Sequence, residues 1–172
     1  MNETIRLMKE RRSIRSYKKE QVAEDKLTAI LEAGEYAASG MGKQKVVSVA
    51  VQDPEIIAQM SKLNAQVMGM DIDPFYGAPT VVVVFGSTES ATTVEDGSLV
   101  IGNLMLAAFA EGVDSCWIHR AKEVFETEEG KALKAAWGLD DSWVGIGNCI
   151  LGYRDGELPE AAERLPGRII RA

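Results

Sequence analysis

The stretch Ala78-Pro79-Thr80-Val81-Val82-Val83-Val84-Phe85 is almost continuously apolar and contains a run of four valines. Valine favours strands because its β-branched side chain packs well on a pleated surface. A strand that is apolar at odd and even positions alike is buried on both of its faces. This stretch therefore predicts the middle strand of a layered structure, with helices above and below the sheet.

Further elements are expected on either side of this strand. Apolar segments predict additional strands at 46–51, 113–118 and 143–153. Apolar residues three and four positions apart indicate helices in the intervals. The predicted helices cover residues 2–11, 24–38, 54 to about 64, 96–111 and 121–137, the last with a break at Gly130. The segment from Gln66 to Tyr76 has no clean period and predicts a mobile loop or a broken helix.

Two segments indicate a partner subunit. The predicted helix over 96–111 is apolar nearly all round, and such a helix has to be covered on every side. In a domain of this size we expect it to be both a central helix and a subunit interface. The end of the chain, 154–172, has no period but carries Leu158, Leu165 and Ile169. An arm of this kind is stable only when it lies on something, and a second subunit is the simplest support.

The composition indicates a single domain over residues 1–172. Hydrophobic residues make up 46% of the chain, which is enough for a substantial core and excludes a disordered protein. We expect no membrane-spanning segment, and Arg6, Lys9 and Glu10 interrupt any signal-peptide core, so a cytoplasmic protein is predicted. Cys116 and Cys149 lie among apolar neighbours and predict two buried thiols.

Several kinds of site are excluded by the motifs. His119 is the only histidine, so no metal site built from several His or Cys ligands is expected. We expect His119 to form a pocket wall rather than a general acid, because no partner carboxylate is close to it in the sequence. The stretch 40–44 lacks the early glycine and the Ser or Thr of a P-loop, and Gly145-Ile146-Gly147 lies inside a strand rather than at a strand-to-helix turn.

The most distinctive polar segment is Arg11-Arg12-Ser13-Ile14-Arg15-Ser16-Tyr17. The first twenty residues carry seven Lys or Arg and three Asp or Glu, whereas the whole chain has a net charge of −7. A guanidinium offers a rigid donor fork that suits phosphate. A basic cluster in an acidic protein indicates a pocket for one anion rather than a nucleic-acid surface. A solvated patch of surface arginines is the alternative that these residues alone leave open.

Taken in order along the chain, several motifs resemble the nitroreductase family. The resemblance covers nearly the whole chain. It rests on Arg11-Arg12-Ser13-Ile14-Arg15 after a first helix, the turn at 37–44 ending in Gln44, Tyr76-Gly77-Ala78-Pro79, the apolar helix 97–112, Asp114-Ser115-Cys116-Trp117-Ile118, Gly152-Tyr153 and Arg164-Leu165-Pro166. It implies an α+β fold with a mostly antiparallel central sheet flanked by helices, a C-terminal arm that packs on the partner subunit, and a homodimer with FMN at the subunit interface.

The resemblance also implies roles for particular residues. Arg11, Arg12 and Ser13 would hold the FMN phosphate and ribityl chain, and Arg15 would reach the N1 and C2 carbonyl edge of the flavin. The remaining implied positions are Arg164 and Arg168 at the phosphate, Ser39 and Gly40 from the other subunit against the ring, Asn64 at the pyrimidine edge, His119 near flavin N5, and Lys43 and Tyr76 on the substrate side.

The implied activity is an NAD(P)H-dependent flavin oxidoreductase. Hydride from NADH or NADPH would pass to flavin N5 and then to a nitroaromatic, quinone or similar acceptor in a two-step cycle. The chain departs from the family at Ala38, Gly42, Lys45 and Val46, where relatives carry proline, asparagine and a Pro-Trp pair. Two alternatives therefore stay open: a flavin storage, sensor or delivery protein with little turnover, and specialised redox chemistry such as reductive dehalogenation or dehydrogenation of a peptide-like substrate.

Overall fold

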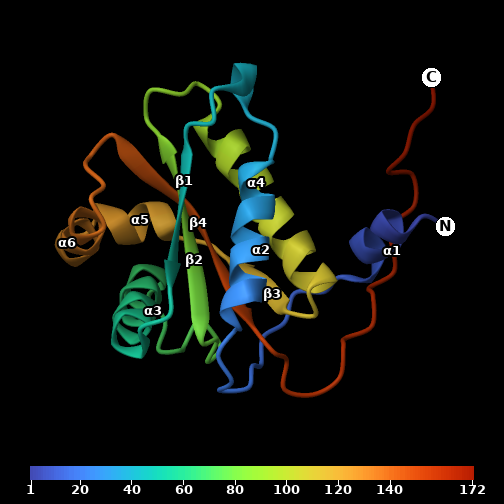
Figure 1. Ribbon diagram of the computed structural model, residues 1–172, viewed down its shortest axis with the longest axis horizontal. Helices are drawn as coiled ribbons and strands as arrows, with labels where there is room; N and C mark the ends of the chain where they lie inside the picture. The colour runs from blue at the N-terminus through green and yellow to red at the C-terminus, as the bar shows by residue number, and fades with distance from the viewer.

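The computed structural model describes residues 1–172. A single four-stranded antiparallel sheet of order β1-β2-β4-β3 forms its centre, with helices on both faces (Figure 1). The elements are α1 Glu3–Glu10, α2 Glu24–Glu35, the 3₁₀ turn η1 Gly40–Gly42, β1 Val46–Val51, α3 Pro54–Met68, β2 Thr80–Ser87, α4 Thr93–Ala110, β3 Asp114–Ile118, α5 Ala121–Glu126, α6 Glu128–Ala136 and β4 Trp143–Gly152. This architecture confirms the predicted α+β class.

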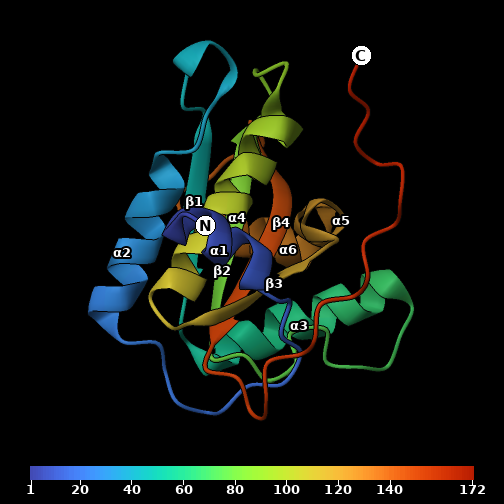
Figure 2. The same cartoon turned by 90° about the vertical axis from the view of Figure 1, so that its right-hand side faces the viewer.

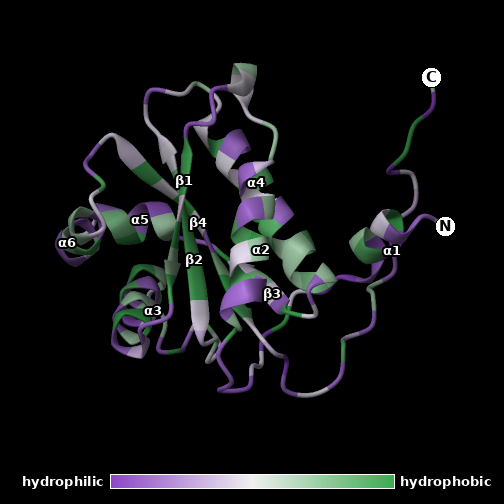
Figure 3. Ribbon diagram, in the orientation of Figure 1, coloured by the Kyte–Doolittle hydropathy of each residue, from purple (hydrophilic) through white to green (hydrophobic).

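Strand β2 lies between β1 and β4, and all eight of its residues are buried. Val81, Val83 and Phe85 point to one face, where they pack with residues of α3 and α5. Val82 and Val84 point to the other face, where α2 and α4 cover them. The expectation of a middle strand covered on both sides is confirmed, and Figure 3 shows the hydrophobic residues concentrated along the strands.

The two thiols lie on opposite faces of this sheet. Cys116 belongs to the core beneath α3 and α5, whereas Cys149 belongs to the core beneath α2 and α4. Both are free and buried, as predicted. Complete burial raises the pKa of Cys149 to about 12. The sheet itself therefore separates the cysteines, and no disulfide links them.

Several predicted helix boundaries are wrong, including the end of α2, which is at Glu35 rather than Ala38, and the start of α4, which is at Thr93 rather than Asp96. Helix α3 continues four residues beyond Asn64 and ends at Gly69, whose left-handed backbone donates to the carbonyls of Ala65 and Gln66. Leu63, Asn64 and Ala65 are buried, so tertiary packing extends the helix beyond its local pattern. The break between α5 and α6 falls at Thr127 and not at Gly130, because Thr127 is extended and its Oγ1 accepts from the Gly130 N–H as an N-cap.

Helix α4 differs from its expected environment. Ile101, Leu104 and Ala108 are fully buried, but Val94 and Leu99 stay 58% and 50% exposed. One chain therefore covers one side of α4 and leaves the other side partly open. By length and composition alone, α4 is also the one helix long and apolar enough to cross a membrane, although no apolar run of that length was expected. The core helix of a soluble protein meets the same criterion, and α4 packs against α2 and the sheet.

The two ends of the chain lie on the same side of the molecule. Helix α1 buries none of its residues, and it lies beside the arm 154–172 on the side away from α6 (Figures 1 and 2). Beyond Leu158 the arm is exposed along its whole length. Leu165, Ile169 and Ile170 are 70%, 84% and 88% exposed, so this apolar surface has no cover within one chain.

Candidate functional site

The arginine segment is fixed along β3, an edge strand of the sheet. Ser13 forms a parallel bridge with Ser115, and the Ile14 N–H donates to the Ser115 carbonyl at 3.0 Å. Ile14 and Tyr17 are buried, and the Tyr17 hydroxyl donates to the Ile14 carbonyl at 2.9 Å. Between these two inward-pointing residues Arg15 is exposed, whereas Arg11 and Arg12, which precede Ile14, are half-buried.

The outer side of this segment forms a cavity of about 750 Å³. The arm contributes its second wall, between residues 159 and 164. The lining residues are Met8, Lys9, Arg11, Arg12, Ser13, Arg15, Pro159, Glu160, Ala161, Ala162 and Arg164. The structure thus brings together five of the predicted cofactor-binding residues from opposite ends of the sequence. Arg168 is not among the lining residues and lies in the exposed end of the arm.

The guanidinium groups in the cavity are only partly satisfied by the chain. Nη1 of Arg11 and Nε of Arg12 are buried without a hydrogen-bond partner. Nη1 of Arg12 donates to the carbonyls of Lys9, Glu10 and Arg11 at 2.8–2.9 Å, so it caps the end of α1. A buried donor without a partner is costly, and a phosphate supplies the acceptors that these two nitrogens lack. The donor set therefore fits an anion such as the FMN phosphate.

Asn64 and His119 meet at the end of β3. Asn64 is fully buried, and its Nδ2 donates to the His119 carbonyl at 2.9 Å. The Oδ1 of Asn64 is buried and has no partner. A second amide oxygen without a partner belongs to Asn148, which is paired with Ile118 across the β3–β4 ladder. The sequence analysis did not identify Asn148, because it lies in the middle of an apolar strand.

The side chain of His119 is exposed, and no carboxylate forms a hydrogen bond or ion pair with it. The nearby Glu123 pairs instead with Arg120 at 2.7 Å, and this contact holds the pKa of the Glu123 carboxyl below its usual range. The role of His119 as a pocket wall therefore stays a prediction.

The predicted turn residues lie elsewhere. Ser39 and Gly40 belong to the turn 39–44, which lies at the top of Figure 1, away from α1 and the arginine segment that follows it. Lys43 is exposed in the same turn. Tyr76 is half-buried against the core, with a left-handed backbone at φ 53°. None of these four residues lines the arginine cavity.

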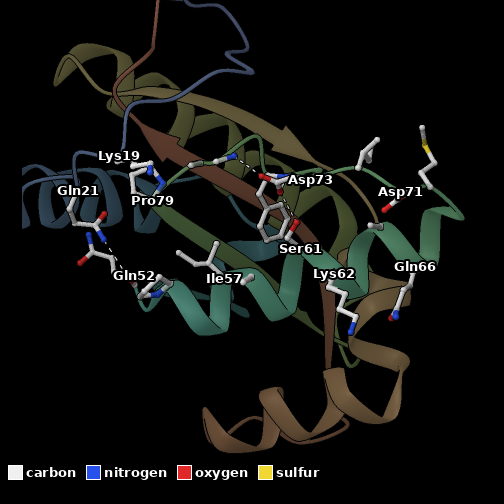
Figure 4. A pocket seen from close by; sticks show the side chains of 18 residues that line it. Lys19, Gln21, Gln52, Ile57, Ser61, Lys62, Gln66, Asp71, Asp73 and Pro79 are labelled. Carbon is white, nitrogen blue, oxygen red and sulfur yellow. Dashed lines mark hydrogen bonds between the residues drawn. The ribbon is translucent and has the colours of Figure 1, made fainter.

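The largest cavity, about 870 Å³, is a different one (Figure 4). It lies between α3 and the loop 70–79 and shares no residue with the arginine cavity. Asp73 holds the loop in place: its Oδ1 accepts from Ser61 Oγ at 2.6 Å, and its Oδ2 accepts from the Gly77 N–H at 2.7 Å. The sequence predicted this region only as irregular, although an Asp followed by Pro and Gly is a turn signal.

Comparisons with known proteins agree with the geometry. The sequence profile described as "Nitroreductase family" matches residues 8–71 and 70–153. A protein of Archaeoglobus fulgidus, named as a candidate NADH dehydrogenase/NAD(P)H nitroreductase, is 30% identical over 99% of this chain and 98% of its own. An FMN reductase [NAD(P)H] of Bacillus subtilis is 38% identical over 44% of this chain and 30% of its own.

Solved structures agree over the full length. A nitroreductase of Bacteroides fragilis with bound FMN superposes with a TM-score of 0.93 at 28% identity, covering 100% of both chains. An FMN-dependent nitroreductase of Clostridium difficile R20291 superposes with a TM-score of 0.89 at 25% identity, covering 99% of both chains. Both the sequence profile and the fold therefore lead to one conclusion: the chain belongs to the nitroreductase family.

Proposed function

We infer that this protein is an NAD(P)H-dependent flavin oxidoreductase that holds FMN in the arginine cavity. The observation that carries the inference is a cavity lined by four arginines, Arg11, Arg12, Arg15 and Arg164, two of which, Arg11 and Arg12, each keep one buried guanidinium nitrogen without a partner. The names of the A. fulgidus and B. subtilis relatives support the nucleotide donor, and the B. fragilis structure supports the cofactor.

The arginine cavity supplies the binding energy for the phosphate. Each hydrogen bond from a guanidinium to a phosphate contributes on the order of 1.5–3 kcal/mol, so a few of them hold a cofactor without a covalent link. Arg11, Ser13 and Arg164 bind the phosphate and ribityl end, together with the free Nε of Arg12; we also propose Arg168 for this end, through movement of the arm. Glu160 also lines the cavity, so the arm has to point the guanidinium of Arg164, and not the carboxylate of Glu160, toward the phosphate.

Around the flavin ring of FMN, the chain provides charged and polar side chains but no nucleophile. FMN supplies the hydride-transfer chemistry when bound, and the protein binds, orients and tunes it. Arg15 is exposed and unpaired in one chain, and we place its positive charge at the N1 edge, where it stabilises negative charge. The free Oδ1 of Asn64 suits an N–H of the pyrimidine edge, and His119 forms the wall beside N5.

We propose a two-step cycle on one face of the site. NADH or NADPH gives a hydride and leaves, and a nitroaromatic, quinone or similar small acceptor then takes its place. Lys43 and Tyr76 are assigned to the substrate side. Lys45 pairs with Glu89 at 2.7 Å. The free thiols on the two faces of the sheet are consistent with a reducing, cytoplasmic location.

We propose a homodimer with FMN at its interface. One chain holds the turn 39–44 apart from the arginine cavity, with the turn at the top of Figure 1 and the cavity beside α1, so we propose that the turn that contacts each FMN comes from the partner. The exposed side of α4 and the exposed apolar residues of the arm, Leu165 and Ile169, provide the surface to be covered. Burying such residues is favourable by roughly 25 cal/mol per Å² of apolar area.

The visible absorption spectrum of the purified protein, before and after anaerobic addition of NADH or NADPH, tests this function. We expect a flavin band that bleaches with the nucleotide and returns with a nitroaromatic or a quinone. A band that nucleotide leaves unchanged would favour the storage, sensor or delivery alternative. A flavin band that bleaches with nucleotide but returns only with a narrow class of acceptors would favour specialised redox chemistry. Protein that stays colourless after incubation with FMN would overturn the proposal and make the arginines surface charge.

A further inference from the structure

Asp96 is a buried carboxylate that holds the turn 39–44. It lies in the first turn of α4 and is only 3% exposed. Its Oδ1 accepts from the Gly40 N–H at 2.8 Å, and its Oδ2 accepts from Thr92 Oγ1 at 3.0 Å and Ser90 Oγ at 3.4 Å. All of these partners are neutral. Burying a charge without a counter-ion is expensive unless hydrogen bonds compensate it, so this carboxylate depends on the contacts that it makes.

The turn is docked closely on this carboxylate and its neighbours. A Cβ on Gly40 would lie 2.2 Å from Thr92 Oγ1, so no larger residue fits there without displacing the turn. Ser39 Oγ accepts from the Gln44 N–H at 3.0 Å and closes the turn from the other side. The contact between Gly40 and Asp96 spans 56 positions of sequence, so it ties the turn to the α4 end of the core.

The conformation of the turn is strained. Met41 and Gln44 adopt φ values of 54° and 52°, in the left-handed region that residues other than glycine rarely occupy. Such conformations persist only where the surrounding structure determines them, and they gather at functional sites. Met41 is also 85% exposed, so the strain does not come from burying its side chain. The hydrogen bonds of Asp96 and Ser39 are what holds the backbone in this shape.

We propose that Asp96 is a positioning residue, which fixes the backbone of the turn 39–44 in the shape that contacts the FMN of the partner subunit. The inference rests on the proposed function, since the turn acts on FMN only in the dimer. The other role for Asp96 is purely local, because a carboxylate in the first turn of a helix also stabilises that helix. The two roles differ in what the loss of the carboxylate does to the cofactor bound across the interface.

The first test compares Asp96→Ala and Asp96→Asn with wild type, measuring FMN dissociation by flavin fluorescence and the two-electron potential of the bound flavin. Asp96→Ala should weaken FMN binding about tenfold, which is one lost charged hydrogen bond, and shift the potential. In Asp96→Asn the side-chain oxygen can still accept from the Gly40 N–H, and the amide can donate to the hydroxyls of Thr92 and Ser90. The FMN dissociation constant of this variant should therefore stay within about threefold of wild type.

A matched control is Asp53→Ala. Asp53 caps α3 by accepting from the N–H of Glu55 at 2.8 Å, and it makes no contact with the turn. Its loss should lower the thermal unfolding midpoint much as the loss of Asp96 does, while FMN affinity and potential stay unchanged. If Asp96→Ala fails to fold, Gly40→Ala replaces it, because the added Cβ displaces the turn from Thr92 and leaves the carboxylate in place. Gly40→Ala should then show the same loss of affinity and the same shift in potential.

Mixed dimers test the action across the interface. One subunit carries Asp96→Ala, and the other carries Arg11→Ala together with Arg15→Ala. One of the two sites then combines intact arginines with an intact turn, so half of the sites should bind FMN with wild-type affinity. If no site recovers, the turn does not act on the partner's cofactor and the proposal is overturned. Wild-type affinity and potential in Asp96→Ala would also overturn it, whereas a wild type that binds no FMN would instead refute the proposed function.

Discussion

The central sheet and the candidate site differ in how much of each one chain completes. Strand β2 pairs on both sides and buries every residue, so the sheet is finished within the chain. The arginine cavity is formed by two segments at the surface, and the turn 39–44 lies apart from it in the same chain. The residues that make the fold and the residues that bind the cofactor are therefore largely separate sets. A substitution in one set should therefore change the free energy of unfolding without changing FMN affinity, and a substitution in the other set should do the reverse.

The largest expected effect is on the sheet. Phe85 is fully buried, and its ring packs edge-on against Phe125 with centroids 4.8 Å apart. Phe85→Ala leaves a cavity in the core on the α5 side, so the free energy of unfolding should fall by about 3–5 kcal/mol. Urea unfolding of the apo protein measures this loss. At temperatures where the variant is folded, its FMN affinity should match that of wild type, and a large loss of affinity would mean that core and site are coupled.

The converse change, Arg11→Ala, is expected to act on the site alone. It removes donors to the phosphate worth about 1.5–3 kcal/mol, so the FMN dissociation constant should rise roughly 10- to 150-fold. The apo protein should unfold at the same urea concentration as wild type, because the buried Nη1 has no partner to lose.

Arg6→Ala is the matched control for Arg11→Ala. Arg6 lies on α1 and pairs with Glu3 and Glu10 instead of lining the cavity. Its replacement should leave FMN binding unchanged. An equal loss of affinity in both variants would mean that only the net positive charge of the N-terminal region matters, and not the donors of one cavity.

A third change separates folding from assembly. Leu165 and Ile169 in the arm are 70% and 84% exposed within one chain, so Leu165→Ser with Ile169→Ser should leave the fold of each subunit intact. Each apolar side chain that is fully buried in a dimer contributes about 1.5–3 kcal/mol, so losing two of them should raise the dimer dissociation constant by more than tenfold. Sedimentation velocity over a dilution series measures it. A wild-type chain that is monomeric at micromolar concentration would contradict the dimer.

The sequence predicted the parts of this molecule that depend on local pattern. The four valines of β2 required cover on both faces, and the predicted start of α3 at residue 54 is confirmed. The end of α3 was missed, because burial of Leu63 and Ala65 carries the helix past its local period. The uncovered side of α4 could be recognised only as an excess of apolar residues, since nothing in one sequence says which residues a second chain will cover.

The candidate site was predictable to a similar degree. The arginine segment is contiguous in the sequence, so its composition suggested an anion pocket, with a solvated patch of surface arginines as the open alternative. The contacts of Asp96 with Gly40 and of Asn64 with His119 span 56 and 55 positions, and no periodicity predicts such a pairing. Arg12 shows a further limit of sequence-based prediction. Its residue type suggested a phosphate ligand, but its Nη1 donates to three backbone carbonyls at the end of α1. This capping role could not be predicted without knowing where the helix ends.

The smallest expected effect concerns the ion pair beside His119. Arg120 lowers the pKa of Glu123 in the folded state, so the pair stabilises the fold above the unfolded carboxyl pKa of about 4.3, and this contribution disappears as the pH falls through the lower folded value. Both side chains are more than a third exposed, so solvent screening limits the effect to about 0.2–1 kcal/mol at pH 7. Glu123→Gln should lose that amount at pH 7 and nothing at pH 3, as measured by urea unfolding at both pH values. A difference that persists at pH 3 would show that Glu123 acts through packing, and a large change in FMN affinity would show that the ion pair belongs to the site rather than to the fold.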